Sequence, residues 1–116
     1  VVFLILILGP SAEEKELIGT WENDVDGLEF KDNGDLIHQG GLYDGWSVSG
    51  SVITFTDSSD PDYEWKYKYE VTGQIMFING LDEDGDVITG ECVVMVKKGY
   101  DIEEEYEKVI DPSWCT

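Results

Sequence analysis

The chain contains no arginine, a single histidine and only two cysteines in 116 residues. Without arginine it lacks the side chain best suited to bidentate contacts with phosphate and guanine. Its seven basic residues, all lysine, are set against 26 acidic ones, and the resulting net charge of −19 repels polyanions. These features argue against nucleic acid and anionic membrane surfaces as partners.

The sequence also lacks the parts of a catalytic site. The lone histidine, His38, cannot supply a histidine pair for zinc. No segment resembles the nucleophile elbow or the oxyanion loop of a hydrolase. We therefore predict that the protein is not an enzyme and carries no resident cofactor.

The two cysteines bear on the compartment. Cys92 and Cys115 would be two buried thiols in a reducing compartment and one disulfide in an exported protein. No Asn-x-Ser/Thr acceptor is present, so N-glycosylation gives no support for export. We predict the disulfide, worth about 3 kcal/mol on the loop-entropy account, and a location outside the cell or at its surface.

A run of eight apolar residues begins the chain: Val1, Val2, Phe3, Leu4, Ile5, Leu6, Ile7 and Leu8. As a helix it would extend about 12 Å, against about 30 Å for the hydrocarbon core of a bilayer, so we predict no membrane span. It could be the remainder of a secretory signal, a strand in the core of its own domain, or a strand donated to a neighbouring subunit. Its β-branched residues and the Gly9-Pro10 stop favour a strand.

The body of the chain alternates with a period of two. In YEWKYKYEV, the side chains of Tyr63, Trp65, Tyr67, Tyr69 and Val71 share one face, and charged residues occupy the other. Turn pairs such as Asn-Gly and Asp-Gly separate further short segments: TWEN, GLEFKD, DLIHQ, GWSVSG, SVITFTD, QIMFING, DVITG and ECVVMVKK. We predict an all-β fold, a small antiparallel up-and-down β-barrel of seven or eight short strands.

We divide the chain into an apolar N-terminal extension (1–12), a barrel (13–98) and an acidic C-terminal segment (99–116) tied back by the disulfide. Ser11 and Glu14 have the spacing of a capping box and predict a short helix through AEEKELI. The segment DIEEEYEKVIDP fits both a strand from Tyr100 to Tyr106 and a helix that Pro112 ends. We favour the helix.

The stretch ELIGTWEN, followed by LEFKDNGDLI, WSVSGSVITF and YKYEVTG, resembles the short lipocalin-like domains of prokaryotic exported proteins over residues 13–98. The resemblance implies a helix that leads into a Gly-x-Trp motif at one end of the barrel, with Gly19 and Trp21 as structural residues. The arginine that commonly stacks on this tryptophan is missing, and only Lys97 or Lys98 is near its place. Because the barrel is short, we expect large side chains to fill its interior: Trp46, Phe55, Trp65, Tyr67 and Phe77.

The acidic segment GLDEDGDVITGE offers a candidate cation site. Asp82, Asp84 and Asp86 are the carboxylates that could bind Ca²⁺ weakly. An EF-hand is disfavoured because its first ligand position would be Gly80 and the flanks have strand patterns. A solvated hairpin turn explains the same residues without a metal.

Two functions are possible, and they differ in whether the apolar extension packs against another chain or against its own. We predict a structural subunit of an extracellular filament or sheath, a homopolymer in which each subunit donates Val1–Leu8 to the next. The alternative is a monomeric exported lipocalin-like domain that binds a small apolar molecule or a protein.

Overall fold

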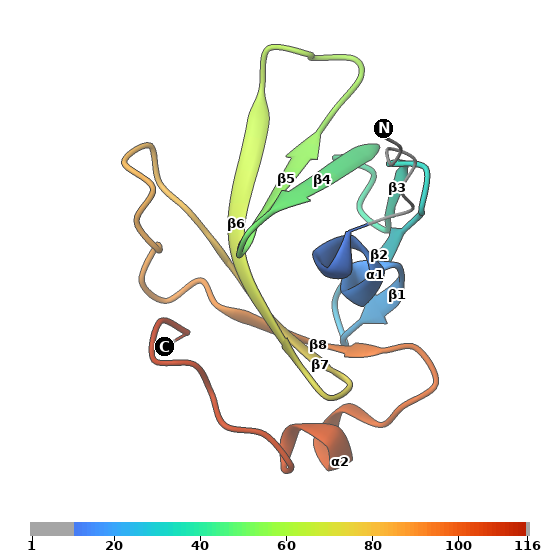
Figure 1. Ribbon diagram of the computed structural model, residues 1–116, viewed down its shortest axis with the longest axis vertical. Coiled ribbons are helices and arrows are strands. Elements are labelled where there is room, and N and C mark those ends of the chain that lie inside the picture. Colours follow the sequence, from blue (N-terminus) through green and yellow to red (C-terminus); the bar gives the residue numbers. More distant parts are fainter. Residues whose placement is uncertain (1–10, 116) are drawn as a thin grey trace, which may run out of the picture.

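Strands dominate residues 11–115, the part of the chain that this computed structural model describes (Figure 1). The predicted donor strand Val1–Leu8 lies outside the described residues. In chain order the elements are α1 (Ala12–Leu17), β1 (Gly19–Glu22), β2 (Gly27–Phe30), β3 (Leu36–His38), β4 (Gly45–Ser49), β5 (Val52–Thr56), β6 (Glu64–Thr72), β7 (Ile75–Gly80), β8 (Val93–Lys97) and α2 (Ile102–Tyr106).

The eight strands form one antiparallel sheet in the order β3-β2-β1-β8-β7-β6-β5-β4. The pairing of β1 with β8 joins strands β1–β3 to strands β4–β8 in one sheet. This sheet curls round, and its two edge strands, β3 and β4, contact each other. At this β3–β4 seam, Leu36 N–H donates to the carbonyl of Asp44 and Trp46 N–H to the carbonyl of Gly34, each at 3.0 Å. The result is a nearly closed up-and-down barrel, as the sequence predicted.

Alternation along the strands gives the barrel its core. In β6 the side chains of Trp65, Tyr67 and Tyr69 are partly or fully buried, whereas Glu64 and Glu70 are exposed. Phe30 links the strands inside the barrel, with ring centroids 5.0 Å from Trp46 and 6.1 Å from Phe55. The aromatic residues therefore serve mainly as core.

A short helix closes one end of the barrel. The predicted capping box is present: Glu14 N–H donates to Ser11 Oγ and Ser11 N–H donates to Glu14 Oε1. The buried indole of Trp21 donates to the carbonyl of Leu17 at 3.0 Å, which joins α1 to β1. Lys97 Nζ lies 5.7 Å from the centre of the Trp21 ring, close enough for a cation–π contact.

Three local predictions need correction. Phe77 does not fill the barrel interior; it points outward from β7 into a second, external core. The segment DVITG is not a strand, because only one bridge, Leu81 to Val87, pairs this region. The C-terminal helix ends at Tyr106 instead of continuing to Pro112.

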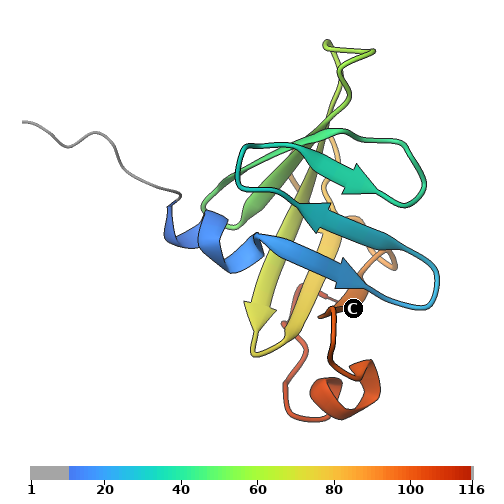
Figure 2. The same cartoon turned by 90° about the vertical axis from the view of Figure 1, so that its right-hand side faces the viewer.

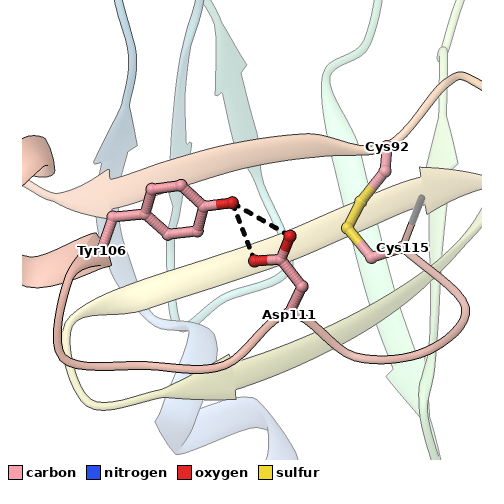
Figure 3. The surroundings of a disulfide bond; sticks show 4 residues. All are labelled: Cys92, Tyr106, Asp111 and Cys115. Atoms are coloured by element: carbon pink, nitrogen blue, oxygen red, sulfur yellow. Dashed lines mark hydrogen bonds between the residues drawn. A yellow bond between two sulfur atoms is a disulfide. The ribbon is translucent and has the colours of Figure 1, made fainter.

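The external core explains the C-terminal segment. Strand β7 is buried along its whole length: Met76 and Ile78 face the barrel interior, while Ile75 and Phe77 face outward. Helix α2 and the chain after it lie against the outer face of β7 and β8 (Figure 1). The predicted disulfide joins Cys92 to Cys115 with a Cα–Cα distance of 5.2 Å (Figure 3). It therefore clamps the last residues onto an apolar surface that would otherwise be exposed.

A tyrosine contact closes the turn between α2 and the disulfide. The hydroxyl of Tyr106 donates to the carboxylate of Asp111, with distances of 2.8 and 3.0 Å to its two oxygens (Figure 3). This bond raises the pKa of Tyr106, since the carboxylate stabilises the protonated phenol. The C-terminal segment is thus held by its apolar face, a hydrogen bond and a disulfide.

Candidate functional site

The barrel has one closed and one open end. In Figure 2, α1 lies at one end of β1, and the β1–β2 turn and the loop of residues 39–44 between β3 and β4 lie at the other. The open end contains a cavity of about 200 Å³, which we call the mouth pocket. Its lining residues are Asp26, Leu28, His38, Leu42, Tyr43, Phe55, Tyr67, Ile78, Val93 and Met95.

The walls of the mouth pocket are apolar. Leu28, Phe55, Ile78 and Met95 are all buried and come from four different strands. The aromatic ring of Tyr43 stacks on Phe55 with a centroid distance of 4.9 Å. A pocket made in this way favours an apolar ligand, because burying apolar surface is the main source of its affinity.

His38 and Asp26 form the first polar group of the pocket. His38 Nε2 lies 2.9 Å from Asp26 Oδ2, and the His38 side chain is only 6% exposed. The other ring nitrogen, Nδ1, accepts a hydrogen bond from Leu42 N–H at 3.1 Å. Since Nδ1 accepts, the neutral ring must carry its proton on Nε2 and donate it to the Asp26 carboxylate.

Two tyrosines form the second polar group. The hydroxyls of Tyr43 and Tyr67 are 3.0 Å apart. Burial, followed by the hydrogen bond with Tyr43, raises the pKa of Tyr67 well above the ordinary value for tyrosine. The phenol of Tyr67 therefore stays protonated at neutral pH. One hydroxyl hydrogen is used within the pair and the other can be donated to a ligand.

A larger hollow beside the barrel is less suited to a ligand. It measures about 660 Å³ and is lined mainly by polar and charged residues of the β5–β6 and β7–β8 regions, among them Asp62, Glu64, Lys66 and Glu83. It is wide open to solvent and its lining is more polar than apolar, so a bound molecule would bury less apolar surface there than in the mouth pocket.

The residues singled out from the sequence lie elsewhere. Gly19 and Trp21 are at the closed end, and the disulfide is on the outside of β7 and β8. Gly19 has a φ of +128°, in a region that favours glycine. None of these residues lines the mouth pocket.

The acidic turn does not gather its carboxylates round a cation. Asp82 Oδ1 instead accepts hydrogen bonds from the backbone N–H groups of Asp84 and Asp86, each at 2.9 Å. Within residues 11–115 no three His, Cys, Asp or Glu side chains form a group that could hold a metal ion. The carboxylate of Asp82 shapes the turn, and the weak calcium site gains no support.

The sequence pattern marks His38 only as a lone histidine and gives no indication of Asp26 or Tyr43. One signal was present: His38 follows Leu36 at a spacing of two, so the two side chains share the inward face of β3. A polar ring on an otherwise apolar inward face indicates a partner inside the barrel. That partner, Asp26, comes from a turn whose geometry the sequence did not specify.

Neither α1 nor α2, the two helices of residues 11–115, is long and apolar enough to cross a membrane. No protein-family model matches the chain, and no curated protein or solved structure matches it.

Proposed function

We propose that this protein is a lipocalin-like binding domain that takes one small molecule into the open end of its barrel. The observation that carries the proposal is the mouth pocket, where apolar walls from four strands meet the His38–Asp26 pair and the Tyr43–Tyr67 hydroxyls. Few polar groups converging in an apolar concavity are typical of sites for small molecules. No reacting group is needed for this role.

The size and charge of the site define the ligand class. A cavity of about 150 Å³ accommodates benzene, so about 200 Å³ suits one ring with a short arm. Asp26 is 39% exposed at the pocket, and the chain carries a net charge of −19, so a cationic or neutral arm is favoured over an anionic one. The expected ligand is therefore an aromatic or short aliphatic molecule with one amine or hydroxyl group.

Three probes of similar size test this class: 2-phenylethylamine, 2-phenylethanol and phenylacetate. They share the ring and differ in the charge of the arm. Nine or ten non-hydrogen atoms correspond to dissociation constants of about 1 mM, which NMR titration of ¹⁵N-labelled protein measures readily. We expect the amine to bind most tightly and the carboxylate least. Failure of all three to shift the amides of the mouth pocket at several millimolar would refute the proposal.

A pair of matched variants locates the binding. Val93 lines the mouth pocket and is 40% exposed, so Val93→Trp can fill the pocket from its rim without opening the core. Val25, 81% exposed in the β1–β2 turn, does not line the pocket and provides the control Val25→Trp. We expect only Val93→Trp to weaken the binding of 2-phenylethylamine. Equal effects of the two substitutions would place the binding elsewhere.

Assembly through the apolar residues Val1–Leu8 is a second proposal, for an extracellular filament or sheath. Two observations support it: the eight apolar residues themselves, and the β3–β4 edge, where residues 11–115 form only one bridge, Asp35 to Gly45, so that another strand could pair there. The disulfide supports an exported location. Deleting residues 1–9 should convert assemblies to monomers in size-exclusion chromatography with light scattering. An unchanged mass would contradict the proposal.

A further inference from the structure

We propose that the loop of residues 39–44 is a lid over the mouth pocket, and that protonation of His38 releases it. The inference rests on the proposed function, because it concerns the regulation of the same pocket. It follows from the two hydrogen bonds of the His38 ring and from the way the loop contributes to the pocket wall.

The loop depends on His38 for its position. His38 accepts twice from it: its backbone carbonyl from Gly41 N–H at 2.9 Å, and its ring Nδ1 from Leu42 N–H at 3.1 Å. The ring also packs against Gly40, where a Cβ atom would come within 2.9 Å of His38 Cε1. The imidazole thus contacts the loop at Gly40 and Leu42, and the backbone carbonyl of His38 holds Gly41 between them.

The same loop forms part of the pocket. Leu42 and Tyr43 both line the cavity, and Tyr43 lies over it with its ring 5.1 Å from His38 and 4.9 Å from Phe55. Leu42 is 60% exposed, so little packing outside the pocket restrains it. If the loop moves away, the pocket loses one side of its wall and one of its two hydroxyls.

Protonation removes an anchor because both ring nitrogens then become donors. Nε2–H keeps its bond to Asp26, whereas Nδ1–H points at another donor, Leu42 N–H. The other titratable groups in this region include Tyr43, Tyr67 and Glu91, with Asp24 in the β1–β2 turn and Asp44 at the end of the loop. Histidine is the side chain that ordinarily changes charge between about pH 5 and pH 8, so acid is the natural trigger.

The first test reads the loop without any ligand. In wild-type protein, the ¹H–¹⁵N heteronuclear NOEs of residues 40–42 should fall between about pH 8 and about pH 5. Their change should follow the titration of the His38 ring, recorded from its Cε1–H resonance in the same samples. NOEs that stay constant while the ring titrates would overturn the proposal.

Two substitutions separate the roles of the ring nitrogens. In His38→Asn the amide oxygen can accept from Leu42 N–H but cannot be protonated, so the loop should stay closed at both pH values. In His38→Gln the longer amide can reach Asp26 but not Leu42, so the loop should be open at both. A pH response of the loop that persists in both variants would contradict the role of His38.

The second test measures binding of 2-phenylethanol, whose charge does not change over this pH range. Loss of one hydrogen bond to the lid corresponds to an affinity about 2- to 10-fold weaker at pH 5 than at pH 8 in the wild type. The ratio should be close to one in both variants. Binding that is equal at the two pH values in the wild type would refute the lid, whereas a pH-dependent loop with no binding at either pH would refute only the proposed function.

Discussion

Asn79 is the most informative residue for a stability measurement. Its side chain is 1% exposed on β7, and neither its amide nitrogen nor its amide oxygen has a hydrogen-bond partner among the described residues. Burying such a group without a partner costs about 1–3 kcal/mol in proteins. Replacing it with a residue of similar shape and no polar atoms should remove that cost.

We therefore expect Asn79→Leu to stabilise the protein. Leucine is slightly larger, and repacking takes back part of the gain, so the net increase in the free energy of unfolding should be about 1–2 kcal/mol. For a chain near 100 residues, 1 kcal/mol corresponds to about 4–8 °C in Tm. Urea unfolding followed by circular dichroism, with the disulfide intact, gives the free energy directly.

Asn23→Leu is the matched control. The amide of Asn23 donates to the carbonyl of Val94 at 3.2 Å and accepts from the N–H groups of Val25 and Asp26. Replacing Asn23 with leucine leaves the Val94 carbonyl and the N–H groups of Val25 and Asp26 without this partner. It should therefore lower the free energy of unfolding by about 1–3 kcal/mol. If Asn79→Leu destabilised the protein as much as Asn23→Leu does, the reasoning on Asn79 would be wrong.

Three further predictions concern the disulfide, the loss of stability at alkaline pH and the Lys97–Trp21 contact at the closed end of the barrel. Replacing Cys92 and Cys115 together with serine should lower the free energy of unfolding by about 3 kcal/mol and make residues 107–114 the first site of limited proteolysis; equal cleavage throughout the chain would contradict the clamp. Burial raises the pKa of Tyr69 to about 12. Because the folded pKa lies above the unfolded value of about 10, this group's contribution to stability is complete below pH 10 and is lost as the pH rises towards 12. Urea unfolding across that range should show a smaller alkaline loss for Tyr69→Phe than for the wild type, and identical losses would refute the assignment. Lys97→Met should cost about 0.5–1 kcal/mol through the lost cation–π contact, measured by the same unfolding assay; no change would mean that the contact is not stabilising.

The parts of the fold that the sequence could predict are the elements with one buried face and one solvent-exposed face, or with a local capping signal. β6 alternates between aromatic and charged residues, so its inward face follows directly from a period of two. Similarly, Ser11 and Glu14 carry a local capping signal that needs no tertiary information. In these cases the determinants lie within a few residues of each other.

The parts that it could not predict depend on distant segments. All six residues of β7 are buried, so alternation gives no direction, and the prediction that Phe77 faces the barrel interior is wrong. Which face is internal depends on the C-terminal segment, which covers Phe77 from the outside. The mouth pocket also depends on contacts between separate segments. Asp26 and His38 meet because of the β2–β3 register and the shape of the adjoining loops.

The β3–β4 seam has a consequence for the motions of the barrel. Elsewhere neighbouring strands pair over two to six residues, but here the circle is completed by one bridge, Asp35 to Gly45, with one backbone hydrogen bond from Leu36 and one from Trp46. Parting these strands requires far less free energy than parting β6 from β7, so the amides of Leu36 and Trp46 should exchange with solvent through a local opening. The amides of β7, covered on both sides, should exchange only when the whole molecule unfolds. We therefore expect local opening of the barrel to concentrate at the β3–β4 seam, with β7 as its most stable strand.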